Sequence, residues 1–112
     1  MSNPSKCKVH RNGDTYWYNE KGQIHREDGP AVIRFDGDKE WWVNGKNHRL
    51  DGPAIEYVSG FKEWHVNGEI HREDGPAVIY QDGTKCWYYQ DNFVNVFSQE
   101  EFEQWLKYKN FL

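Results

Sequence analysis

Apolar and polar residues alternate over short stretches of this chain, and turn-forming pairs separate the stretches. Alternation with a period of two predicts β-strands, because successive side chains point to opposite faces of a sheet. The Asp-Gly and Asn-Gly pairs predict tight hairpin turns, because both supply the positive φ that such turns need. We therefore expect an antiparallel meander of about eight strands. The expected strands are residues 8–10, 15–18, 31–35, 39–43, 54–58, 62–66, 77–80 and 85–89.

The hairpins repeat. The motif His-Arg-x-Asp-Gly-Pro-Ala begins at His25, His48 and His71, at intervals of 23 residues. The last three copies of Gly-x-x-x-Trp are also spaced by 23 residues, and the first copy lies 24 residues before the second. Its copies end at Trp17, Trp41, Trp64 and Trp87. Self-similarity at a fixed period is the signature of a repeat architecture, so residues 1–112 are expected to form a single domain with hairpin repeats over 8–92.

The C-terminal segment has a different pattern. Ser98 followed by Glu101 forms a capping box, which predicts the start of a helix. We expect this helix, within residues 98–110, to cap the last hairpin, because an open repeat array needs a covered end. Its apolar residues at helical spacing are Phe102, Trp105 and Leu106.

Positions that are identical in every copy are expected to serve the packing of the repeat itself. Alternation places Trp41 and Val43 on one face, and their equivalents in the other copies on the same face. We expect this face to be the core, with Trp41 and Trp64 buried. The matching apolar positions on the partner strands are Val32, Ile55 and Val78.

The opposite face carries large side chains that differ from copy to copy. An aromatic row is predicted there, made of Tyr18, Trp42, His65 and Tyr88. Beside it lie Tyr16, Glu40, Glu63 and Cys86. An exposed aromatic row indicates a binding surface. The alternative is that the helix or a second copy of the chain covers it.

The repeated His, Arg and Asp residues do not have the spacing of a reactive site. Equivalent residues of successive hairpins lie two strands, or about 9.5 Å, apart, whereas zinc ligands lie about 2 Å from one ion. No Ser or Cys recurs beside His and Asp to form a hydrolytic triad. We therefore expect no metal, no cofactor and no enzymatic activity. The structural interpretation is that each Arg pairs with the Asp of its motif or with backbone carbonyls, and the alternative is a ladder that binds phosphate or carboxylate groups.

Composition limits the partners further. The net charge is −4, with 14 Lys and Arg against 18 Asp and Glu, which argues against non-specific binding to nucleic acid. The sequence contains no apolar run typical of a signal peptide or a membrane span, so we expect a cytoplasmic protein that does not bind membranes.

Residues 12–92 resemble a variant of the MORN (membrane occupation and recognition nexus) repeat. The likeness rests on the segment Trp41-Trp-Val-Asn-Gly-Lys-Asn-His-Arg-Leu-Asp-Gly-Pro-Ala. It departs from the family where Arg follows the His and where Asp-Gly-Pro-Ala replaces the last Gly. The form with His-Arg-x-Asp-Gly-Pro-Ala is similar to uncharacterised proteins of bacteriophages and large DNA viruses. The resemblance to the MORN repeat implies an elongated, curved sheet used for protein contacts or, in some relatives, for binding acidic lipids. The viral likeness implies a small protein that binds and blocks a factor in the host cytoplasm.

The leading hypothesis is a non-catalytic module that binds a protein, such as a host defence factor, through the aromatic row. A second hypothesis is a sponge for a nucleotide-like ligand, with the row stacking on a base and Arg34 or Arg49 holding phosphate. A third is a structural or assembly subunit that associates through its sheet edges.

The first prediction concerns association. The open edge of the front hairpin invites pairing with another chain, so we expect a homodimer in exchange with the monomer. Light scattering over a range of protein concentrations measures this equilibrium. A monomer that persists at high concentration would contradict it.

Overall fold

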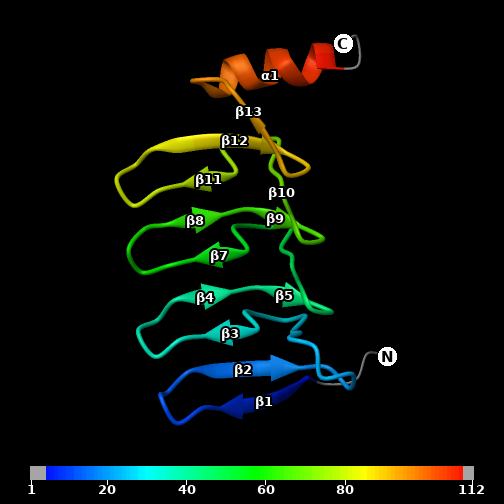
Figure 1. Ribbon diagram of the computed structural model, residues 1–112, viewed down its shortest axis with the longest axis vertical. Coiled ribbons are helices and arrows are strands. Elements are labelled where there is room, and N and C mark those ends of the chain that lie inside the picture. Colours follow the sequence, from blue (N-terminus) through cyan, green and yellow to red (C-terminus); the bar gives the residue numbers. More distant parts are fainter. Residues whose placement is uncertain (1–4, 110–112) are drawn as a thin grey trace.

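The computed structural model describes residues 5–109, which form an elongated antiparallel sheet with a helix at one end (Figure 1). Its extents are 48 × 34 × 17 Å. The main strands belong to one sheet and lie side by side in a single layer (Figure 1), in keeping with the shortest extent of 17 Å. The predicted fold class, an antiparallel meander of hairpins with a C-terminal helix, is confirmed.

Nine strands of the described chain form the main sheet, and their spatial order follows the sequence. They are β1 (Lys6–Val9), β2 (Thr15–Tyr18), β3 (Val32–Ile33), β4 (Lys39–Glu40), β7 (Ile55–Glu56), β8 (Lys62–Glu63), β11 (Val78–Ile79), β12 (Lys85–Tyr89) and β13 (Asn92–Val94). Two small hairpins accompany the sheet. They pair β5 (Trp42–Val43) with β6 (Lys46–Asn47), and β9 (His65–Val66) with β10 (Glu69–Ile70).

The second strand of each middle repeat is interrupted at its tryptophan. The sequence predicts one strand over 39–43, but β4 ends at Glu40 and β5 begins at Trp42. The backbone of Trp41 still bonds to the next repeat, with its N–H donating to the carbonyl of Ala54 at 2.7 Å. The interruption directs β5 into its own hairpin with β6, which the sequence did not predict.

The strand register corrects the predicted core. Val32 lies directly opposite Glu40, and residues directly opposite in an antiparallel pair share a face. Since Glu40 precedes Trp41, the valine lies on the face that does not carry the tryptophan, and the same holds for Ile55. Val78 pairs with Glu63 and Cys86 in the same way.

Alanine, not valine, lies opposite the tryptophans. The pairing of β7 with β4 and β8 places Ala54 between Trp41 and Trp64, and Ala54 is fully buried. Both tryptophans are only half-buried, so the prediction that they would be buried is wrong. A flat indole on a single-layer sheet shields the small residue beside it with one face, and its other face has no second layer of the sheet to cover it.

An arginine covers the second face of each of three tryptophans. The guanidinium carbons of these arginines lie 3.8–4.0 Å from the ring centroids, in cation–π geometry. Each guanidinium also donates to the Asp of its own motif and to the carbonyl of its Pro, at 2.9–3.1 Å. The pairs are Arg26 over Trp17, Arg49 over Trp41 and Arg72 over Trp64.

The motif glycine makes room for this arginine. A Cβ built on Gly75 would lie 2.5 Å from the guanidinium carbon of Arg72, and one on Gly52 would lie 2.8 Å from that of Arg49. Carbon atoms at van der Waals contact are about 3.5–4.0 Å apart. The invariant Gly therefore permits a close approach, and the guanidinium lies between the glycine and the indole.

The motif histidine connects each repeat to the next. The backbone N–H of Asn44, at the start of the following Asn-Gly turn, donates to Nδ1 of His25 at 2.9 Å. The same bond joins Asn67 to His48 and Gln90 to His71, at 2.9 and 3.0 Å. All three donors have positive φ. The histidines thus fix the turn conformation of the neighbouring repeat.

The helix α1 (Gln99–Tyr108) replaces the missing arginine at the last repeat. Trp87 is buried at 4% exposure against α1 and β13, with fully buried Phe102 in the same cluster. Its indole N–H donates to Oε1 of Gln99 at 2.7 Å. Ser98 is the N-cap and accepts from the N–H of Glu101, as the capping box predicts. Residue 110, the end of the predicted cap, lies outside the described residues.

The close approach of glycine to arginine predicts a non-additive pair of substitutions. Gly75→Ala should displace Arg72 from Trp64 and should cost about 1–3 kcal/mol of unfolding free energy, as should Arg72→Ala. The double variant should cost little more than either single variant, because both remove the same stack. Urea denaturation measures all three.

Arg11→Ala, at an exposed turn position, is the control and should change the free energy of unfolding by less than about 0.5 kcal/mol. Additive losses in the Gly75 and Arg72 pair would contradict the stack as the cause.

Candidate functional site

The two faces of the sheet differ in how closely their side chains repeat from copy to copy. The motif face is defined by the tryptophans of Gly-x-x-x-Trp and the loops that cover them, and it repeats the same arginine contact at three of the four tryptophans. The variable face is defined by the side chains that alternate with those tryptophans, and its aromatic row changes in residue type along the array, as Tyr, Trp, His and Tyr. Side-chain contacts bring Tyr18, Trp42, His65 and Tyr88 to it, as predicted.

Trp42 is held in place by a buried carboxylate. Its indole N–H donates to Oε1 of Glu40 at 3.0 Å, and Glu40 is only 6% exposed. The other oxygen, Oε2, accepts from the hydroxyl of Tyr57 at 3.2 Å. Burial and the nearby Glu40 charge raise the pKa of Tyr57, which therefore remains a neutral hydroxyl donor. The half-buried Trp42 ring is thus fixed in orientation by the chain itself.

Arg34 also belongs to this network. Its guanidinium donates to Oε2 of Glu40 at 3.2 Å and to the hydroxyl of Tyr16 at 3.3 Å, and it pairs with Asp14 at 3.5 Å. Burial alone would lower the pKa of Arg34, but its hydrogen bond to Glu40 and the charge of that carboxylate outweigh burial and raise the pKa. Arg34 therefore neutralises buried carboxylates, and this role leaves it poorly placed to hold a phosphate.

His65 and Tyr88 continue the row with different degrees of cover. His65 is 8% exposed, and its Nε2 lies 2.9 Å from Oε2 of Glu63. Tyr88 is half-buried and contacts Phe93 edge to face, with ring centroids 5.6 Å apart. The row is therefore a partly covered, preorganised surface, more enclosed at His65 than the sequence predicts.

Tyr18 begins the row at the front hairpin. Its ring stacks on that of Tyr16, with centroids 6.2 Å apart and an interplanar angle of 15°. Both residues lie on β2 and are half-buried. The aromatic row thus runs from the front hairpin to the last one.

Arg49 lies on the motif face, away from the row. Its guanidinium covers Trp41 and donates to Asp51, and it also pairs with Glu56 at 3.5 Å. The structure therefore does not bring Arg34 and Arg49 together as a phosphate clamp. Both guanidinium groups already pair with carboxylates of the chain.

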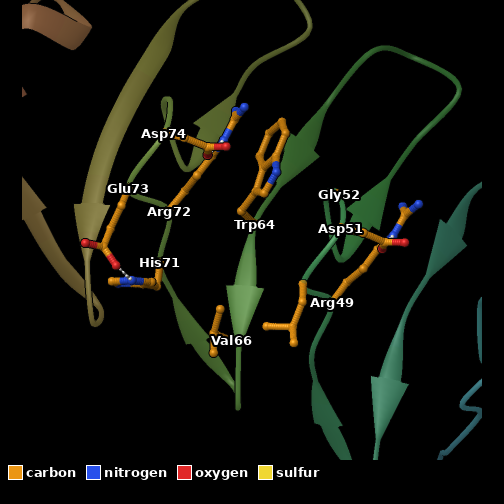
Figure 2. A pocket seen from close by; sticks show the side chains of 10 residues that line it. Arg49, Asp51, Gly52, Trp64, Val66, His71, Arg72, Glu73 and Asp74 are labelled. Carbon is orange, nitrogen blue, oxygen red and sulfur yellow. Dashed lines mark hydrogen bonds and ion pairs between the residues drawn. The ribbon is translucent and has the colours of Figure 1, made fainter.

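The motif face carries a groove between successive loops (Figure 2). Asp51 and Gly52 line one side, and Trp64, Arg72 and Asp74 line the other, with Arg72 alongside the indole. The carboxylates of Asp51 and Asp74 are 89% and 88% exposed, whereas the arginines that they bind are 22% exposed. The groove therefore presents acid to solvent and does not favour an anionic ligand.

One feature of the variable face was not predicted. Tyr57, Phe61 and Tyr80 gather at the Asp-Gly side of the sheet, where they line a shallow pocket with Gln81 and Asp82. A signal was present in the sequence. Phe61 follows Gly60 at the position where the other copies have Asp14, Asp38 and Thr84.

Comparisons of the chain with models of protein families, with curated proteins and with solved structures give no match. No helix within residues 5–109 has the length and apolar character needed to cross a membrane. The described part of the chain also brings together no group of three or more His, Cys, Asp or Glu side chains that would hold a metal ion.

Proposed function

We propose that this chain is a non-catalytic binding module that engages a protein partner through its variable face. The observation that carries the proposal is the separation of roles between the faces. The repeated residues make the stacks and hydrogen bonds of the motif face, and the aromatic row lies on the other side of a single layer. Residues that the repeat does not need for its own packing are free to serve recognition.

The chemistry of the row suits a protein partner. Trp and Tyr dominate the binding energy of many interfaces, because they bury a large area while losing little conformational entropy. Trp42 is held by Glu40, and Tyr88 is packed against Phe93, so both rings lose less freedom on binding than free side chains would. His65 is nearly covered and is paired with Glu63, so it offers a partner less surface than Trp42 or Tyr88.

The resemblance to viral repeat proteins supports a host factor as the protein partner. A small protein with a rigid recognition face and no reactive centre suits the blocking of a host factor by occupying its surface. The alternative, a sponge for nucleotide-like molecules, has less support because Arg34 and Arg49 pair with carboxylates on opposite faces.

The test uses substitutions in the aromatic row. Trp42→Ala and Tyr88→Ala should remain folded and should each weaken binding by about 2 kcal/mol or more. The partner is first identified by pull-down from a host lysate with mass spectrometry. Calorimetric titration of that partner then measures the affinity, and native mass spectrometry of the purified chain reports any retained small molecule.

Leu50→Ala is the matched control on the motif face, where Leu50 is 80% exposed. It should leave the affinity unchanged. Loss of binding in Leu50→Ala, with full binding by the two row variants, would move the interface to the motif face and contradict the proposal. Unfolding of Trp42→Ala would instead show that the row is a second core.

A further inference from the structure

The third of the turns that open Gly-x-x-x-Trp, Ser59-Gly60, differs from the first two at the residue that follows its glycine. In the first two turns an Asp follows the Gly, and its carboxylate accepts a backbone N–H from the next repeat. Asp14 accepts from Phe35, and Asp38 accepts from Val58, both at 2.9 Å. At the third turn the equivalent residue is Phe61, which has no side-chain acceptor for the N–H of Gln81.

The backbone of this turn is unchanged. The N–H of Tyr57 donates to the carbonyl of Phe61 at 3.0 Å, just as the N–H of Arg34 donates to that of Asp38 at 2.9 Å. The turn therefore accommodates either residue, and folding does not require a phenylalanine there. A place where a repeat gives up one of its own stabilising bonds is a place to look for function.

Phe61 gains two aromatic neighbours in exchange for the lost bond. The strand register places it opposite Tyr57 on one side and Tyr80 on the other. Both ring centroids lie 5.7 Å from that of Phe61, with interplanar angles of 37° and 60°. Three inclined rings from three strand ends therefore line one shallow pocket.

The side chains that line this pocket include a negative charge and no positive charge. Of the side chains that line it, the only ionisable ones are the two tyrosines and Asp82, and no Lys or Arg is among these five residues. The backbone N–H of Thr84 donates to Asp82 at 2.9 Å and lowers the pKa of its carboxyl, so Asp82 is an anion at neutral pH. Behind the rings, Glu40 accepts from the Tyr57 hydroxyl and fixes that ring.

We propose that the pocket formed by Tyr57, Phe61, Tyr80 and Asp82 binds a methylated ammonium group, supplied by a methylated lysine of the protein partner. The inference rests on the proposed function and names the chemistry of one contact. Aromatic faces carry negative potential, and groups of such rings recognise quaternary ammonium ions. A methylated ammonium is cationic and sheds water more easily than lysine, which suits a shallow pocket of aromatic rings with a carboxylate beside it.

The test is a titration followed by NMR of the aromatic ring resonances. The probes are Nα-acetyl-trimethyllysine amide, the unmethylated lysine amide, and a neutral analogue with a tert-butyl group in place of the trimethylammonium. The methylated probe should shift the rings of Tyr57, Phe61 and Tyr80 and should bind about fivefold or more tightly than either of the others. Equal binding of the neutral analogue would overturn recognition of the cation, and tighter binding of free choline would overturn a lysine as its source.

Phe61→Asp is the decisive variant, because it restores the residue that the first two turns use. It should keep or raise the melting temperature and should abolish the ring shifts. Phe35→Ala removes another exposed ring, at a neighbouring turn, and should leave probe binding unchanged. Probe binding that survives Phe61→Asp would overturn the inference.

The two proposals fail separately. If the partner from the pull-down binds Phe61→Asp as well as it binds the unaltered chain, the methyl-lysine contact is wrong while the aromatic row remains supported. If Trp42→Ala and Tyr88→Ala bind normally, the row is wrong whatever the probe shows.

Discussion

The stack of a guanidinium on an indole is the interaction on which the rest of this structure depends. A single-layer sheet cannot bury its side chains against a second layer, so each repeat must cover its own large apolar residue. The arginine of the motif does this with the methylene stem and the flat face of its guanidinium, while Asp and a proline carbonyl satisfy its N–H groups. Glycine is required beside it because a Cβ would occupy the position of the guanidinium.

Because arginines cover the tryptophans on the motif face, few residues of the variable face are needed for packing. Covering the tryptophans from the motif loops means that the variable face needs only a few small buried residues, such as Val32 and Val78. The remaining positions carry a polar network around Glu40 and an aromatic row that changes from copy to copy. Repetition thus provides stability on one side of the sheet and variety on the other.

The ends of the array show the same constraint. The last tryptophan, Trp87, has no following motif to supply an arginine, and α1 covers it with Phe102 and Gln99 instead. At the other end, β1 is an edge strand whose four residues are all exposed. A helix therefore covers one end of the array, and an exposed edge strand forms the other end.

Sequence reasoning predicted the repeat, the meander and the helix, because each follows from local spacing and turn chemistry. It placed Val32 on the wrong face because it matched apolar residues by type. Counting outward from the turn, in which Arg34 bonds to Asp38, would have paired Val32 with Glu40 and Ala31 with Trp41. The bond from Asn44 to His25 was beyond prediction, because it depends on how successive repeats stack in space.

The candidate site was predicted in part for similar reasons. Alternation is a local property, and it brought the aromatic row to one face correctly. Arg49 was grouped with the row by charge alone, although it lies on the opposite face over Trp41. Phe61 was overlooked because it directly precedes the predicted strand 62–66 and was assigned to the turn. Its difference from the first two copies appears only when the four turns are compared.

Nitrogen-detected NMR of the arginine side chains tests the central claim most directly, because it reports on the stack without a partner. The account predicts that the Nε–H protons of Arg26, Arg49 and Arg72 exchange slowly with solvent, and that the adjacent methylene protons show upfield ring-current shifts. Arg11, which is exposed, should show neither effect. Rapid exchange and unshifted methylenes at the three motif arginines would contradict the account.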